Sequence, residues 1–201
     1  MWAGPLSFRP RGVDTGAMWW LIGIAVVLIA AAIIFVSQFN KLRRLDVLCV
    51  GALGDIDTLL TKRADLVPNL VETVTGARDF EASTIEAVTA ARTQTQAAQS
   101  VDQKAAADAS MTGALSRLFA VAEAYPQLTA TSNFQTLQVQ LAEIEGQLQF
   151  ARQYYNDSVV HLNTALRTIP SMWFGGVAGV SQRQVYSEPD EGRRSAPRVQ
   201  F

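Results

Sequence analysis

One stretch constrains this chain more than any other. Residues 18–36, MWWLIGIAVVLIAAAIIFV, are nineteen consecutive residues without a charge. A helix of this length, at about 1.5 Å per residue, covers roughly 28 Å, which is close to the hydrocarbon core of a bilayer. Eleven of these residues are Leu, Ile, Val or Phe. We therefore expect a transmembrane helix over 18–39 whose anchor residues are Trp19, Trp20, Leu21, Ile22, Ile24, Val26, Val27, Leu28, Ile29, Ile33, Ile34, Phe35 and Val36.

Two alternatives to a retained anchor are a buried core helix and a cleaved signal peptide. A core helix seldom lacks a polar stripe for so long. A signal peptide has a shorter apolar region and a cleavage site of small residues, whereas Phe35, Val36 and Phe39 stand at the end of this run. Residues 1–17 predict a disordered leader, and Met18 is an alternative start of the chain.

The charges flanking the apolar run predict its orientation. Arg9 and Arg11 precede it, and Lys41, Arg43 and Arg44 follow it. The larger positive charge favours the cytoplasmic side. We expect a single-pass membrane protein with its C-terminal domain in the cytoplasm.

Charge and residue counts exclude several functions. Between Lys41 and Thr168 there are 11 Lys and Arg against 14 Asp and Glu, a net charge of −3, and no basic block that would bind nucleic acid. The single Cys49 excludes an internal disulfide and a cysteine metal site, and we expect it to be a small buried residue. The single His161 excludes a histidine-rich metal site.

Helical spacing begins directly after the apolar run. A first soluble helix is predicted by apolar residues three and four apart, namely Leu45, Leu48, Ala52, Ile56 and Leu59. A break is expected near Arg63–Asp65, with Asp65 capping a second helix and Pro68 in its first turn, although a kinked continuous helix is an alternative. The second helix should run to about Ala98, loosened at Gly76.

The middle of the chain predicts a third helix. Residues 94–110 are rich in Ala and Gln, so we expect a turn near Ser100–Asp102 and a segment that buries little. The third helix then continues to Pro126, and Thr131 or Ser132 should cap the next one. Its apolar face is formed by Met111, Leu115, Leu118, Ala122 and Tyr125.

The fourth helix has the clearest period in the chain. Apolar and small residues alternate at spacings of three and four over five heptads, from Phe134 through Leu137, Leu141, Ile144, Leu148, Ala151, Tyr155, Ser158, Leu162 and Ala165 to Ile169. Such a period predicts coiled-coil-like packing. The fold class is therefore all-α, with one N-terminal transmembrane helix continuing into an antiparallel four-helix bundle over 40–169.

The chain changes character after Pro170. Residues 170–186 are apolar and rich in glycine, and we expect them to lie on the membrane, on the bundle or against another subunit. Residues 187–201 predict a disordered tail.

No catalytic constellation is present in the sequence. Asp157 and His161 share a helix face, but no further ligand completes a metal site, so a solvated ion pair is the preferred interpretation. Glu143 and Glu145 face different directions, and no phosphate loop or nucleophile elbow occurs. Polar residues beside the packing face, which can fix register or form a ligand site, are Arg63, Asn69, Arg152, Asn156 and Asn163.

Three segments resemble the signature segments of the LemA family: KRADLVPNLVETV at 62–74, GALSRLFAVAEAYPQL at 113–128 and ARQYYNDSVVHLNTALRTIP at 151–170. The resemblance covers roughly residues 18–186. The residues that carry it are Arg63, Asp65, Leu66, Pro68, Asn69, Leu70, Glu72, Tyr125, Pro126, Arg152, Tyr155, Asn156, Asp157 and Pro170. The chain departs from the family pattern at Gly51 and Gly54, and at Tyr186, which is followed by Ser187 rather than Phe.

The resemblance implies a protein of the bacterial cell (inner) membrane with a helical bundle and no established enzymatic activity. Relatives occur beside membrane metalloprotease genes, and one branch is associated with magnetosome membranes. We expect a non-enzymatic scaffold or adaptor, without cofactor or metal, that contacts the lipid bilayer, other copies of itself and another membrane protein. The alternative is a regulatory or signalling input module acting on a membrane partner such as a protease.

Overall fold

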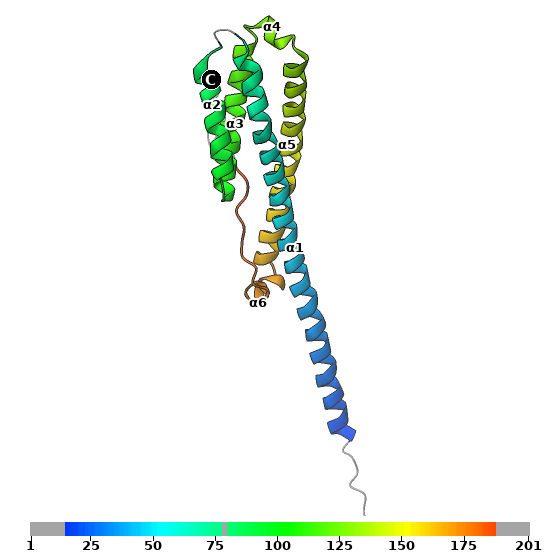
Figure 1. The fold of residues 1–201 in the computed structure, drawn as a ribbon. Helices are drawn as coiled ribbons and strands as arrows, with labels where there is room; N and C mark the ends of the chain where they lie inside the picture. Colours follow the sequence, from blue (N-terminus) through cyan, green and yellow to red (C-terminus); the bar gives the residue numbers. More distant parts are fainter. Residues whose placement is uncertain (1–14, 78–79, 188–201) are drawn as a thin grey trace, which may run out of the picture.

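The computed structural model describes residues 15–77 and 80–187, and these form an all-α protein without a strand. Figure 1 shows a bundle of long helices from which the first part of α1 extends alone. The helices are α1 (Thr15–Thr75), α2 (Ala82–Ala97), α3 (Val101–Ala122), α4 (Pro126–Thr129), α5 (Ser132–Arg167), the 3-10 helix η1 (Ser171–Trp173) and α6 (Gly175–Ala178).

Helix α1 is the element around which the molecule is built. It begins three residues before the predicted start at Met18 and runs unbroken for 61 residues. Its first part is covered by no other element, and every predicted anchor side chain is exposed. Among the described residues, α1 is the helix long and apolar enough to cross a membrane. Residues 1–14, within the predicted leader, and 188–201, within the predicted tail, lie outside the described residues.

The predicted helix break near Arg63–Asp65 is wrong, and the continuous alternative is correct. Pro68 lies inside α1, and Asp65 is exposed in mid-helix rather than at a cap. Proline cannot donate to the carbonyl four residues earlier, which belongs to Ala64. The guanidinium Nε of Arg92 on α2 donates to that oxygen at 3.2 Å. A contact from another helix therefore satisfies the acceptor that Pro68 leaves free.

The turn falls instead at Gly76, so the predicted second helix is divided between α1 and α2. The four long helices of the bundle are α1, α2, α3 and α5. The turn near Ser100 is confirmed, because Ser100 caps α3 through a reciprocal capping box with Gln103. Thr131 caps α5, and its hydroxyl accepts from the N–H of Phe134 at 3.4 Å.

The predicted packing faces are mostly confirmed. On α5 the heptad positions are buried or half-buried from Phe134 to Ala165, but Ile169 lies beyond the helix end and is exposed. On α1, Leu48 was predicted to lie on the packing face, but it is exposed. Its neighbour Cys49 is buried, which confirms the prediction for that residue. The Ala-rich start of α3 is not loosely packed as predicted. Small side chains let it pack closely, and Lys104, Ala105, Ala107 and Asp108 are buried.

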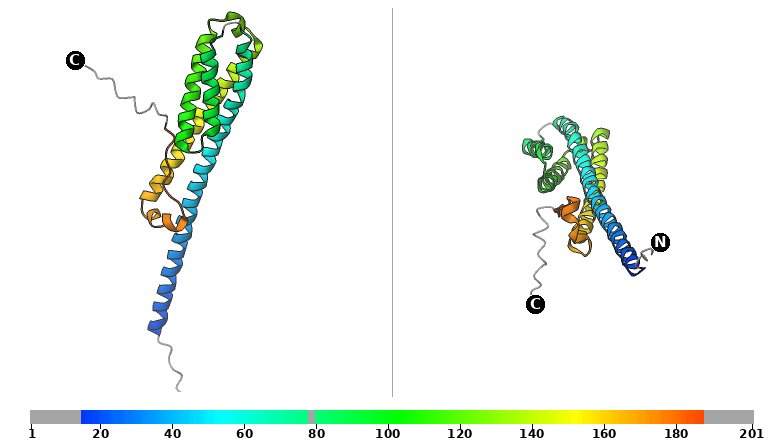
Figure 2. Two further views of the ribbon diagram at one scale, coloured as in Figure 1. Left: turned by 60° about the vertical axis from the view of Figure 1, so that its left-hand side comes forward. Right: turned by 90° about the horizontal axis from the view of Figure 1, so that it is seen from below.

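The core has two apolar parts stacked along the bundle. The upper part joins α1, α2, α3 and α5 around residues such as Leu70, Met111, Leu118 and Phe134. The lower part joins α1 and α5 to Ala178, Val180 and Tyr186. These three residues belong to residues 170–187, which we call the C-terminal segment. Figure 2 shows this segment returning from α6 toward the lower ends of α2 and α3. The C-terminal segment thus completes the lower half of the domain, to which α3 contributes Val101 and Ala105 of its first turns.

Candidate functional site

Four charged side chains from three helices meet between the two parts of the core. We call Arg63 of α1, Asp108 of α3, and Glu145 and Arg152 of α5 the charge cluster. Arg63 pairs with Oδ1 of Asp108, and its Nη1 lies 2.5 Å from Oε2 of Glu145. Arg152 Nη2 lies 2.6 Å from Oδ2 of Asp108 and 3.4 Å from Oε1 of Glu145. Two cations therefore face two anions, and the cluster is neutral as a whole.

The cluster is deeply buried at its centre. Arg63 is 1% exposed and Asp108 is 0% exposed. Arg63 also donates to the Thr112 hydroxyl at 3.1 Å and to the backbone oxygen of Asp108 at 3.2 Å. Buried charges are tolerated only when they are paired and their remaining donors are bonded. These contacts fix the register of α1 against both α3 and α5.

The rim of the cluster reaches solvent. The Glu145 side chain is 40% exposed, and Arg63 and Glu145 contribute to the lining of a hollow of about 230 Å³. The remaining lining comes from α3 and α5 and is largely apolar, including Leu115, Phe119 and Leu141. Lys104 and Asp57 form a further ion pair between α3 and α1.

The C-terminal segment adds a fifth member to this site. The phenol of Tyr186 donates to Oδ2 of Asp108 at 2.8 Å and lies 3.1 Å from the backbone oxygen of Lys104. Burial, followed by the negative charge of Asp108, raises the pKa of Tyr186 above its usual value. The phenol therefore stays protonated and keeps its role as a donor to the carboxylate.

Two asparagines of α5 hold the backbone of this segment. Asn156 accepts from the N–H of Tyr186 at 2.7 Å and donates to its carbonyl at 2.9 Å. Asn163 makes the same pair of bonds to Arg183, at 3.0 and 2.8 Å. Seven helical residues and three extended residues both span about 10 Å, so the spacings match. Each amide thus replaces the two bonds that a neighbouring strand would make.

Side-chain contacts complete this attachment. The Tyr155 hydroxyl donates to the backbone oxygen of Gln184 at 2.9 Å, and burial raises the pKa of Tyr155. Arg183 forms an ion pair with Asp46 of α1, with 2.8 Å between Nη2 and Oδ1. Burial raises the pKa of the Cys49 thiol, which lies in the lower part of the core.

The predicted site residues divide into two groups. The structure brings Arg63, Arg152, Tyr155, Asn156 and Asn163 together around α5 and the C-terminal segment. It leaves other residues of the matching segments exposed, namely Asp65, Pro68, Asn69, Glu72, Pro126 and Asp157. Leu70 is a core residue, and the half-buried ones are Leu66, Tyr125 and Pro170.

Asp157 and His161 are both exposed on α5. Over residues 15–77 and 80–187, no three His, Cys, Asp or Glu side chains come together as metal ligands. From the sequence we gave Glu145 no role as a paired carboxylate, because Glu143 and Glu145 face different directions on a helix. In the structure, Glu145 is a member of the charge cluster.

Sequence reasoning missed Asp108 and the role of Tyr186. A signal for Asp108 was present, because Lys104 and Asp108 continue the spacing of Met111 and Leu115 toward the start of α3. Charged residues at core positions of a helix indicate buried pairs. Tyr186 gave no such signal, since the residues around it have no period.

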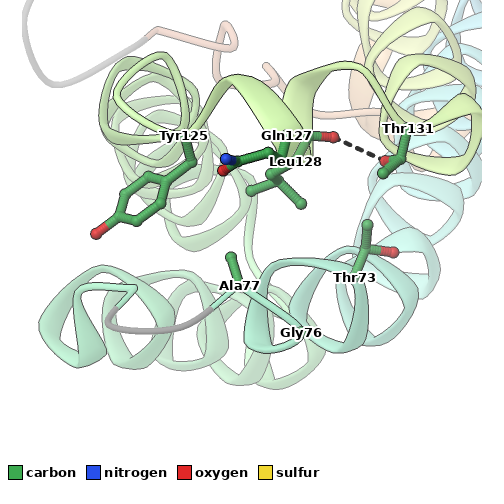
Figure 3. A pocket seen from close by; sticks show the side chains of 7 residues that line it. All are labelled: Thr73, Gly76, Ala77, Tyr125, Gln127, Leu128 and Thr131. Atoms are coloured by element: carbon green, nitrogen blue, oxygen red, sulfur yellow. Dashed lines mark hydrogen bonds between the residues drawn. The ribbon is translucent and has the colours of Figure 1, made fainter.

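A second hollow lies at the end of the bundle farthest from the free part of α1. It has a volume of about 480 Å³ and is lined by Thr73, Gly76, Ala77, Tyr125, Gln127, Leu128 and Thr131. Figure 3 shows Gln127 and Leu128 above Ala77 and Gly76, and the Thr131 hydroxyl donating to the Leu128 carbonyl at 2.7 Å. None of the lining residues is charged, and this hollow contains no acid, base or nucleophile pair.

The fold and site define a class of protein: a helical bundle closed by its own C-terminal segment, whose first helix extends outward as an uncovered apolar span. The model of the LemA family matches residues 52–201. The chain therefore belongs to the LemA family, as the three segments indicated. A comparison with curated proteins found no match.

Proposed function

We propose that this protein is a non-enzymatic scaffold, anchored in the bacterial inner membrane by α1, that holds copies of its bundle at a fixed orientation on the cytoplasmic side. One observation carries the proposal: α1 passes without interruption from the apolar span into the bundle. A flexible linker would let the domain rotate freely, whereas a continuous helix transmits the tilt of the span to the bundle.

The buried contacts of α1 support a rigid connection. Arg63 joins it to α3 and α5 through the charge cluster. Asp46 joins it to the C-terminal segment through Arg183. Moving α1 independently of the bundle would break the buried Arg63–Asp108 pair, at a cost of about 3–5 kcal/mol.

The outer face of α5 supports association with a second copy. Phe150 is 75% exposed and Tyr154 is 53% exposed, and residues four apart share one face of a helix. Anchoring in one plane with one orientation raises the effective concentration of such faces. A twofold pair of α5 helices presents the same residues on both sides.

Cysteine cross-linking in vesicles tests this proposal. In a Tyr154→Cys chain, the native Cys49 should not form a cross-link because it is buried. We expect an intermolecular disulfide between Tyr154→Cys chains, and its loss when Phe150→Lys is added. Gln149→Cys, an exposed position on a different face of α5, is the matched control. Equal cross-linking at both positions, or none in either, would overturn self-association.

A second candidate is a regulatory input module acting on a membrane partner. The same continuous α1 favours it, because a change in the span would reach the charge cluster, about 40 Å further along the helix. Copurification from native membranes identifies the partner. Unchanged partner activity after deletion of residues 41–187 would exclude this function.

A further inference from the structure

The short elements that follow α5 expose an unusual amount of apolar surface. Between Arg167 and Arg183 there is no charged residue. Ile169, Met172, Trp173 and Val177 are 69%, 46%, 65% and 64% exposed. Figure 1 shows this part, with α6, at the end of the bundle from which α1 emerges.

The inner side of these elements is also packed against protein. Ser171, Gly175 and Ala178 are buried. A Cβ at Gly175 would lie 2.9 Å from a methyl carbon of Leu166, so glycine allows this close approach to α5. A segment that is apolar on its packed side and again on its outer side marks a surface that contacts a partner or a membrane.

Two contacts set the level of η1 and α6 along α1. The ring of Phe174 packs edge-on against Phe35, with 5.7 Å between centroids and 76° between planes. The Ser171 hydroxyl donates to Oε1 of Gln38 at 2.7 Å. The segment therefore lies beside residues 35–38, and Phe35 is itself one of the anchor residues.

This level can be compared with the thickness of a bilayer. If Trp19 and Trp20 mark one interface, a hydrocarbon core of about 30 Å ends about 20 residues further on, at Phe39 and Asn40. Phe35 then lies about 6 Å inside the core. The first charged residue, Lys41, follows the boundary directly. Tilting of α1 would move the boundary further along the helix and place the segment deeper.

We propose that η1 and α6 lie in the bilayer interface, where Ile169, Met172, Trp173 and Val177 contact the boundary between headgroups and acyl chains. The inference rests on the proposed anchoring of α1. Tryptophan favours this layer, and an uncharged segment held against the membrane helix has lipid as its nearest neighbour. Exposed cations at the same end, Lys41, Arg43 and Arg44, suit anionic headgroups.

This contact gives the bundle a second attachment to the membrane. A single helix can rotate about its own axis, whereas a helix with a lateral apolar element can do so only by lifting that element out of the lipid. The surface of α5 that faces neighbouring copies would then keep one direction in the plane of the membrane.

Quenching by brominated lipids tests the inference in the full-length chain. A variant with Trp2, Trp19 and Trp20 replaced by Phe keeps Trp173 alone, and is reconstituted in phosphatidylglycerol–phosphatidylcholine vesicles brominated near the top of the acyl chains. We expect loss of Trp173 fluorescence relative to vesicles without bromine. A matched chain with Val139→Trp as its only tryptophan reports the opposite end of α5, and we expect it to be unquenched.

A third chain that keeps only Trp19 separates this inference from the proposed anchoring. Quenching of Trp19 without quenching of Trp173 would overturn the interfacial contact and leave the anchor intact. No quenching of either would overturn both. Equal quenching of Trp173 and of the tryptophan at position 139 would also overturn the contact, as nonspecific adsorption.

A second variant tests the contact without relying on Trp173 alone. Met172→Glu with Val177→Glu changes two exposed side chains, so helix content should be retained by circular dichroism. We expect it to abolish quenching of Trp173 while the Trp19 chain carrying the same changes stays quenched. Persistent quenching of Trp173 in this variant would show that the exposed apolar side chains do not hold the segment in lipid.

Discussion

Replacing Asp108 by Asn isolates the contribution of the charge cluster to stability. The change keeps the size of the side chain but removes the anion that Arg63 and Arg152 share. An amide has one acceptor oxygen where the carboxylate has two. The amide NH2 therefore faces a guanidinium N–H, and these two donors cannot form a hydrogen bond. The cluster also acquires a net charge of +1 in a buried position.

The expected cost follows from this burial. Removing one partner of a buried, hydrogen-bonded pair destabilises a protein by about 3–5 kcal/mol. A domain of this size changes its melting temperature by about 2–4 °C per kcal/mol, so Asp108→Asn should lower it by about 6–20 °C. Asp55→Asn is the matched control, because Asp55 is exposed on α1. It should cost about 1 kcal/mol or less.

Thermal unfolding of the full-length protein in mild detergent, followed by circular dichroism at 222 nm, measures both variants. A combined Arg63→Met and Asp108→Leu chain should be more stable than Asp108→Asn, since Arg152 and Glu145 then remain as a neutral pair, 3.4 Å apart. The reasoning is refuted if Asp108→Asn melts no lower than Asp55→Asn.

Three further predictions concern the C-terminal segment and α1. Asn156→Ala with Asn163→Ala removes four hydrogen bonds to the segment, at about 0.5–1.5 kcal/mol each, and should speed tryptic cleavage after Arg183 by at least about 30-fold. Because the pKa of Tyr186 is raised on folding, the unfolded chain releases its proton first, near pH 10. Stability should therefore fall above about pH 10, by up to 1.4 kcal/mol per pH unit, and less steeply in Tyr186→Phe, as measured by urea unfolding. Arg92→Met leaves a carbonyl beside Pro68 without its donor and should cost about 1–3 kcal/mol in the same assay.

Each of these three predictions has a control. Asn69→Ala, at an exposed position of α1, should leave tryptic cleavage unchanged, and equal acceleration would mean that the asparagine bonds do not hold the segment. Tyr154→Phe, at an exposed tyrosine, should leave the alkaline slope as in the wild type. Arg92→Met with unchanged stability would mean that water satisfies the carbonyl as well as the guanidinium does.

The sequence by itself determined the long apolar span, the all-helical class and most of the helix faces. These properties are local: hydropathy and spacing along α5, from Phe134 to Ala165, are sufficient to show which side is buried. Caps such as Ser100 and Thr131 are local for the same reason. The family also followed from local segments, and the match over 52–201 confirmed it.

Only the tertiary structure decided how α1 passes Pro68 and what meets Arg63. The donor to the Ala64 carbonyl comes from another helix, so local rules predicted a break where none occurs. Arg63 finds Asp108 across 45 residues and Glu145 across 82. Such pairs depend on the register between packed helices, which spacing within a single helix does not determine.

The C-terminal segment shows the same limit. The apolar residues of 180–187 follow neither a helical nor a strand spacing. The backbone of this part is bonded to side-chain amides of α5 and not to a helix or a sheet, so no such spacing is needed. The position of η1 and α6 beside Phe35 likewise depends on where α5 ends relative to α1. The sequence showed an apolar segment and an apolar span, and the packing of α1 against α5 placed them at the same level.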